Sequence, residues 1–280
     1  MSVSIQLTSA MQANLVALQQ TSQLMATTQQ RLATGKRVNS AVDDAQAYFS
    51  ARQGNDKADA LSALKLDMGE GLQKVKSALT AIDSALDVLK QMKGLANQAK
   101  ATSDTTTRSD LAAQYNDLKA QFESILSKDA NYKGSNLLAA NNNLTIQFNE
   151  DNTSNLTINS VDTTSANAAV NGTAGYDPAN AAANWANDTD ISNSLTEVGT
   201  AIKNLSSLST KLASFSSFIQ TRMDFTTNII DINKEGSNNL VNADMNEESA
   251  NMLTLQTRQQ LGTTSLSLSN QAAQSILRLF

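Results

Sequence analysis

Both ends of the chain carry helical seams with the spacing of a coiled coil. Near the N-terminus, apolar and small polar residues alternate in steps of four and three: Met11, Leu15, Leu18, Ser22, Met25, Gln29 and Leu32. Near the C-terminus, one seam comprises Leu261, Leu268, Ala272 and Leu279, and a second stripe comprises Leu266, Ala273, Leu277 and Phe280. The second stripe would leave an apolar face for a neighbouring molecule. Because these thin arms have little of their own chain to pack on, they favour a self-assembling protein over an enzyme.

The composition supports helix-on-helix packing and disfavours several classes of function. Hydrophobic residues make up 40% of the 280-residue chain but aromatic residues only 4%, so aliphatic side chains must supply the burial. The net charge is 21 − 26 = −5 without a cluster of Lys and Arg, which disfavours nucleic-acid binding. Cys and His are both absent, which removes thiolate chemistry, the commonest general base and the commonest metal ligand. We therefore expect no catalytic, metal or cofactor site.

Long helices are predicted on both sides of the middle of the chain. An N-terminal arm from about Ile5 to Leu32 is expected to stop at Gly35, and a short helix over 42–51 is expected to be interrupted at Gly54. Apolar residues at three-or-four spacing predict a long helix from Leu61 past Ala96, with Gly69 and Gly71 at close helix contacts. After a turn over 104–107, a capping pattern at Thr107 and Asp110 predicts an antiparallel partner helix ending near Lys128. A second long helix is predicted from Ile191 to near Gly236, and Asp244 is expected to start the C-terminal helix.

Between these helices the pattern changes to that of strands. Residues 144–148 and 156–161 alternate apolar and polar side chains, which predicts a β-hairpin with a long loop. Residues 162–190 are rich in Asn, Ala, Thr and Gly, and we expect a surface loop that buries no core. The predicted fold is mainly α, with long antiparallel rods, a β-hairpin and terminal helices that pair as a coiled coil. The predicted segments are an N-terminal arm (1–40), a rod with the hairpin (41–161), a variable loop (162–190), a second rod segment (191–238) and a C-terminal arm (239–280).

Two long segments resemble the bacterial flagellin family. They are LQQTSQLMATTQQRLATGKRVNSAVDDAQAYFSA at 18–51 and NLVNADMNEESANMLTLQTRQQLGTTSLSLSNQAAQSILRLF at 239–280, and LTIQF at 144–148 is similar to the family's hairpin. The resemblance covers roughly 1–161 and 191–280. It implies a homopolymeric, extracellular filament subunit for motility, exported through the flagellar type III channel. It also implies that both arms are disordered in the monomer and pair only after docking beneath a filament cap.

The resemblance leaves a close rival, and the N-terminus bears on export. A hook–filament junction protein has similar terminal helices, although QAAQSILRLF and NLVNADMNEESA are more similar to flagellin. A soluble coiled-coil adhesin or other secreted binding protein is the alternative from another class. The N-terminus lacks the pattern of a cleaved signal, and no run approaches the ~20 apolar residues that span a bilayer. We therefore expect either a cytoplasmic protein or export without a cleaved signal, and no insertion into a membrane.

The resemblance also suggests two partner surfaces. The apolar tip formed by Leu277, Leu279 and Phe280 is expected to contact neighbouring subunits and, before assembly, an export chaperone. Residues 89–98 read LKQMKGLANQ and resemble LQRVRELAVQ, a motif through which a Toll-like receptor senses flagellins. The residues of that surface are Lys90, Gln91, Gly94, Leu95 and Gln98. Because Gln91 stands where the motif has a key Arg and Gly94 where it has Glu, we expect weak recognition.

Overall fold

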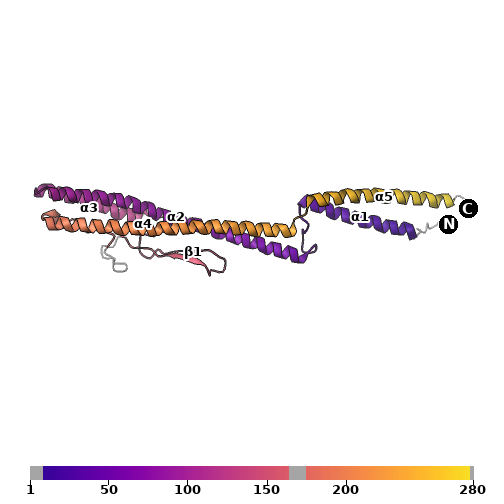
Figure 1. The fold of residues 1–280 in the computed structure, drawn as a ribbon, viewed down its shortest axis with the longest axis horizontal. Coiled ribbons are helices and arrows are strands. Elements are labelled where there is room, and N and C mark those ends of the chain that lie inside the picture. The colour runs from indigo at the N-terminus through magenta and orange to yellow at the C-terminus, as the bar shows by residue number, and fades with distance from the viewer. Residues whose placement is uncertain (1–8, 164–174, 278–280) are drawn as a thin grey trace. The chain divides into compact units, whose positions relative to one another are not determined.

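A computed structural model describes residues 9–163 and 175–277 of the chain. The described α-helices are α1 (Ser9–Thr34), α2 (Ala45–Ala101), α3 (Thr105–Ser124), α4 (Asp188–Val241) and α5 (Met245–Leu277). Strands β1 (Leu144–Gln147) and β2 (Asn155–Ile158) lie between α3 and α4, together with a π-helical turn η1 (Ile125–Asp129) and a 3-10 turn η2 (Ala182–Trp185) (Figure 1). The mainly helical fold predicted from the sequence is confirmed.

The structure divides into two compact units. Unit 1 comprises Met1–Ala58 and Asp231–Phe280, and unit 2 comprises Asp59–Ile230. Both α2 and α4 therefore contribute residues to each unit.

Unit 2 holds a continuous apolar core built from α2, α3, α4 and the hairpin. The α2 stripe predicted from the sequence is largely buried, with Met68, Val75, Ile82 and Leu89 fully shielded from solvent. Residues from α3 and α4, including Phe122, complete the same cluster. Because the apolar positions recur every three or four residues along each helix, one face of every helix reaches this core.

The start of α3 differs from the prediction in its cap. The helix begins at Thr105, and the Asp104 carboxylate accepts a hydrogen bond from the Thr107 backbone N–H at 2.9 Å. Thr107 therefore lies inside the first turn and does not start the helix. The guanidinium of Arg108 turns back to α2, where its Nε donates to the carbonyls of Ala99 at 3.1 Å and Thr102 at 2.7 Å. These bonds satisfy carbonyl groups at the end of α2 that the helix itself cannot pair.

The β-hairpin is antiparallel, and its register follows the alternation in the sequence. Leu144 pairs with Ile158, and Thr145 pairs with Thr157. Leu144 and Ile146 are buried while the residues between them are exposed, so one face of β1 covers the core. This face reaches Gly71 of α2, where a Cβ atom would lie 2.5 Å from Cδ1 of Ile146. The close contact predicted at Gly71 therefore exists, but its partner is a strand and not a helix.

The prediction that 162–190 buries no core is wrong for the described part of that segment. Ala181 and Trp185 belong to the core of unit 2, and Trp185 is fully buried. The chain reaches this position through three successive residues with positive φ, namely Ala183 (44°), Asn184 (51°) and Trp185 (57°). Because the rest of the segment is mostly small and polar, its composition did not predict that the large side chain of Trp185 is buried.

In unit 1, α2 and α4 pass through glycines that were expected to end helices. α2 continues through Gly54. A Cβ atom at this position would lie 2.3 Å from Oγ of Ser237, so the glycine lets α4 approach. A short helix over 42–51 interrupted at Gly54 is therefore wrong. α4 likewise runs past Gly236 to Val241. Gly35 does end α1: it has φ 69°, and its N–H donates to the Arg31 carbonyl at 2.8 Å.

Candidate functional site: the paired terminal helices

The terminal helices α1 and α5 lie side by side in unit 1. The least exposed positions of α1 are Met11, Asn14, Leu18, Thr21, Met25, Thr28 and Arg31 with Leu32. Those of α5 are Glu248, Met252, Leu255, Gln259, Gly262, Leu266 and Ser269. Both sets advance in steps of three and four, which is the spacing of a two-helix seam.

The seam of α1 is partly as predicted and partly shifted by one residue. Met11 is buried and Leu18, Met25 and Leu32 are half-buried, as a seam requires. The intervening positions are Asn14, Thr21 and Thr28, whereas the sequence pattern placed Leu15, Ser22 and Gln29 there. Leu15 is instead exposed. The predicted four-then-three spacing selected the wrong neighbour at these three positions, where the structure steps by three and then by four.

The described residues of the two predicted α5 stripes do not lie where they were expected. Leu266 lies on the seam, while Leu261 and Leu268 are 65% and 68% exposed. Ala272 is also exposed. Leu277 is the last residue of α5, and its side chain, with Leu279 and Phe280, lies outside the part of the chain that is described.

The arms approach most closely at Gly262. A Cβ atom there would lie 2.7 Å from Cδ2 of Leu18, so only glycine leaves room for that side chain. Four residues before Leu18, the amide Nδ2 of Asn14 donates to Oγ of Ser265 at 3.4 Å. Gly262, which the sequence pattern did not single out, is thus a point of close contact between the two arms.

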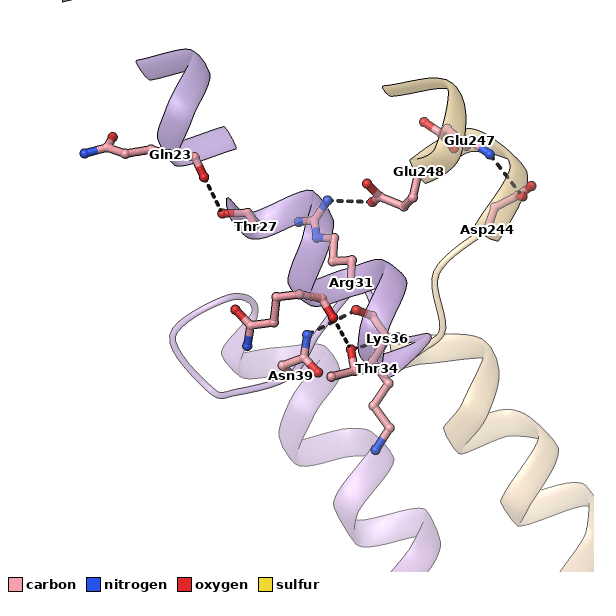
Figure 2. A network of polar contacts seen from close by, with 10 residues as sticks. Gln23, Thr27, Arg31, Thr34, Lys36, Asn39, Asp244, Glu247 and Glu248 are labelled. Atoms are coloured by element: carbon pink, nitrogen blue, oxygen red, sulfur yellow. Dashed lines mark hydrogen bonds and ion pairs between the residues drawn. The ribbon is translucent and has the colours of Figure 1, made fainter. Parts of the chain in front are cut away.

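A polar junction joins the arms where α1 ends and α5 begins. Figure 2 shows the guanidinium of Arg31 pointing at the carboxylate of Glu248, with an Nη1–Oε1 distance of 2.9 Å. The side chain of Glu248 is only 8% exposed, and that of Arg31 is 33% exposed. Nε of Arg31 and Oε2 of Glu248 are buried without a hydrogen-bond partner among the described residues. One ion pair thus fixes the register, at the cost of two unsatisfied polar atoms.

Backbone hydrogen bonds hold the two connecting segments together beside this ion pair. The N–H of Ala243 donates to the Gly35 carbonyl at 2.9 Å, and the N–H of Arg37 donates to the Val241 carbonyl at 2.7 Å. Val38 and Val241 are buried there in a small apolar cluster. The Asp43 carboxylate accepts the N–H groups of Asn39 and Ser40, which holds the Asp43 pKa below its usual value. The junction is therefore an ordered connection between the arms.

The outer faces of the arms carry apolar side chains that no described residue covers. Leu15, Val16 and Leu24 on α1 are exposed, as are Leu253, Leu261 and Leu268 on α5. A groove between the helices is lined by Leu18, Leu24, Arg258 and Gly262, among others. The arms thus mix apolar and small polar residues in their seam and leave further leucines exposed outside it.

The predicted receptor surface lies in unit 2, along a second groove. Gln91, Gly94, Leu95 and Gln98 of α2 line this groove opposite Gln114, Asp117 and Leu118 of α3. Lys90 is not among the lining residues, and its Nζ lies 2.9 Å from the Asp87 carboxylate on the exposed face of α2. At Gly94 a Cβ atom would meet nothing within 4 Å.

Residues 9–163 and 175–277 form no metal site beside these surfaces. No group of three or more Cys, His, Asp or Glu side chains in this part of the chain is arranged to hold a metal ion. In the same residues no helix is both long and apolar enough to cross a membrane.

These features define a class: a mainly helical protein whose paired chain ends expose apolar faces for further contacts. The description "bacterial flagellin N-terminal helical region" matches residues 5–143, and "bacterial flagellin C-terminal helical region" matches residues 195–280. The chain belongs to the bacterial flagellin family. Members of this family are structural subunits that polymerise into the extracellular flagellar filament.

Relatives match over almost the whole chain. Flagellin FljK of Caulobacter vibrioides is 32% identical over 95% of this chain and 95% of its own. A flagellin of Brucella melitensis is 31% identical over 95% of both chains. A crystal structure of Bacillus cereus flagellin gives a TM-score of 0.48 at 20% identity, covering 57% of this chain and 88% of the other.

Proposed function

We propose that this chain builds a flagellar filament by folding and packing its terminal arms at the same time. The observation that carries the proposal is the uncovered row of leucines on the outer faces of α1 and α5. In the seam between the arms, apolar residues are interrupted by Asn14, Thr28 and Gly262, while ordering costs about 1–2 kcal/mol per residue. Neighbouring subunits supply the missing apolar cover, so polymerisation and arm folding are one coupled process.

In this proposal the arms at 1–40 and 239–280 form an inner coiled-coil domain of the filament. The assembly residues are those that the sequence named: Met11, Leu15, Leu18, Met25 and Leu32 on the first arm, and Leu261, Leu266, Leu268, Ala272, Leu277, Leu279 and Phe280 on the second. Those on the seam join the two arms, and Leu15, Leu261 and Leu268 contact other subunits. The rod segments at 41–161 and 191–238 form the surrounding wall, with 162–190 as the variable segment. No catalytic activity is proposed.

Seeded polymerisation of purified full-length monomer, followed by negative-stain electron microscopy, tests this proposal. Replacing Leu261 and Leu268 with Ser should abolish long tubes and leave the monomer's circular dichroism unchanged, because both side chains are exposed. Replacing the exposed Gln256 with Ser is the matched control on the same helix and should leave the tubes intact. Long tubes from the double-leucine variant would refute the role of this face.

The same assay separates a main filament subunit from a hook–filament junction protein. Uninterrupted growth of long tubes from one purified protein supports the filament subunit, whereas addition that stops after a short layer supports the junction protein. The proposal also includes export without a cleaved signal, a chaperone at the C-terminal tip and growth beneath a cap protein. Cellular experiments, not this assay, test these three parts.

We also infer that a Toll-like receptor recognises the α2 surface weakly. Gln91 cannot supply the bidentate contact of an arginine, and Gly94 presents no side chain to a partner. A reporter-cell assay with purified monomer should give a weak response that increases when Gln91 is replaced by Arg. A potent response from the unmodified monomer would contradict this inference.

A further inference from the structure

A segment of unit 2, here called the strap (residues 175–187), lies across α3 and α4. Its backbone is held from both helices: the Ala181 N–H donates to the Asn116 side chain at 2.8 Å, and the Ala179 N–H donates to the Glu197 carboxylate at 2.9 Å. Nδ2 of Asn204 donates to the Gly175 carbonyl at 3.3 Å. The strap is therefore tied to α3 and α4 mainly by polar contacts.

One aromatic side chain anchors the strap in the core. Trp185 is fully buried, and its Nε1 donates to Oγ of Ser194 at 3.0 Å. The centroid of its ring lies 4.9 Å from that of the Tyr115 ring, in an edge-to-face arrangement. The left-handed backbone at Ala183, Asn184 and Trp185 is unfavourable for residues with a Cβ atom. The strap thus combines a deep anchor with a strained backbone, as expected of an element that can release.

A buried charged cluster lies beneath the strap. The side chain of Asp177 is 3% exposed and that of Lys119 is 10% exposed, and Oδ2 of Asp177 lies 3.4 Å from Nζ of Lys119. Lys119 also pairs with Glu123 one turn further along α3, which places a second carboxylate beside the pair of Asp177 and Lys119. Oδ1 of Asp177 is buried without a hydrogen-bond partner among the described residues. One ammonium group therefore serves two carboxylates, and one carboxylate oxygen is left unsatisfied.

The other titratable groups at this place do not relieve the excess of negative charge. The hydroxyl of Tyr115 is buried, and burial with the nearby Glu197 and Asp177 carboxylates raises its pKa, so it stays neutral. Burial is also the main cause that raises the pKa of Asp177 from 3.8 to about 6, with Lys119 lowering it and Glu123 raising it. Burial beside a second carboxylate therefore disfavours the ionised form of Asp177.

We propose that the strap is a proton-controlled latch, which binds α3 and α4 tightly when Asp177 is protonated and loosens when Asp177 ionises. A protonated Asp177 carries no charge and leaves Lys119 to neutralise the Glu123 carboxylate alone. The ionised form places a second negative charge beside Glu123, with Glu197 on the facing helix. Since the folded-state pKa exceeds the unfolded value, this contribution to stability is full below pH 3.8 and is lost as pH rises through about 6.

The chain contains one tryptophan, so its fluorescence reports directly on the strap. We would measure Trp185 emission and its quenching by acrylamide in the full-length monomer between about pH 4 and pH 8. The expected result is a blue-shifted, protected tryptophan at acid pH that becomes red-shifted and more readily quenched through a transition near pH 6. A signal that does not change with pH would overturn the proposal.

Three variants assign the transition to this cluster. Asp177→Asn should abolish it, and Glu123→Gln, at a partly exposed position, should move the midpoint to lower pH by removing a negative charge. Asp117→Asn, an exposed carboxylate on the same helix, is the matched control and should leave the midpoint unchanged. An unaltered transition in either of the first two variants would refute the latch, and Glu123→Gln keeps the test decisive if Asp177→Asn does not fold. Filament formation is not part of this readout, so failure here is independent of the proposed assembly.

Discussion

Replacing Gly71 with Ala tests how tightly the hairpin is packed on α2. The new Cβ atom would lie 2.5 Å from Cδ1 and 2.8 Å from Cγ1 of Ile146, which is 3% exposed and has little space to move. Overpacking of this kind costs about 1–3 kcal/mol. Alanine also favours a helix by up to about 1 kcal/mol relative to glycine, which offsets part of that cost.

A second substitution on the same helix removes the ambiguity. Gly94→Ala brings the same gain in helix propensity, but its Cβ atom meets nothing within 4 Å. The difference between the two variants is therefore the packing cost alone, and Gly71→Ala should be less stable than Gly94→Ala by about 1–3 kcal/mol. Gly94→Ala should itself be more stable than the original chain by up to about 1 kcal/mol.

Guanidinium unfolding of the monomer, followed by Trp185 fluorescence, measures both variants in unit 2. Adding Ile146→Val to Gly71→Ala removes the Cδ1 methyl that the new Cβ atom would meet, so the double variant should recover part of the loss. A favourable coupling of at least about 0.5 kcal/mol between the two sites is expected for residues in direct contact. Equal stability of Gly71→Ala and Gly94→Ala would refute the close contact between β1 and α2.

Three further substitutions follow from the structure. Gly262→Ala should push the arms apart and lower the melting temperature of filaments, whereas Gly236→Ala, which meets no neighbouring atom within 4 Å, should not lower it. Glu248→Gln weakens the pair with partly exposed Arg31 and should destabilise the assembled arms by roughly 1–3 kcal/mol, read from filament disassembly in denaturant. Trp185→Phe loses the hydrogen bond to a buried serine and should cost about 1 kcal/mol in unfolding followed by circular dichroism.

Helical periodicity predicted the elements better than it predicted their ends. The α2 stripe is buried as expected because its apolar side chains are large and regularly spaced. Gly54 and Gly236 were expected to end helices, yet both helices continue through them. At Gly54 the cause is a neighbour distant in sequence, Ser237, whose proximity no local pattern contains.

The candidate site shows the same limit. Spacing correctly placed Met11, Leu18, Met25 and Leu32 on one face of α1, but it could not tell which adjacent residue completes the seam. The ion pair between Arg31 and Glu248 joins residues 217 positions apart, so the sequence alone gave no reason to connect them. Only the fold could reveal these partners.

Trp185 was missed for a different reason. It stands alone among small and polar residues, so no periodic pattern surrounds it. Its partner Tyr115 lies on α3, seventy positions earlier. The left-handed turn that brings the ring inward contains no glycine, so the sequence did not predict a turn there. A lone tryptophan in a polar segment is nevertheless a signal, since its large apolar surface favours burial.

The contrast between the two units bears on why the arms need neighbours. Unit 2 buries large side chains such as Tyr115, Phe122 and Trp185 in one continuous cluster. The seam between α1 and α5 instead alternates residues such as Leu18 and Leu255 with Asn14, Thr28 and Gly262, while exposed leucines lie on the outer faces of both helices. In the proposed assembly, neighbouring subunits cover these outer faces and add to the apolar area that the seam buries. We therefore expect a stable unit 2 in the monomer, and arms whose stability depends on the concentration of other subunits.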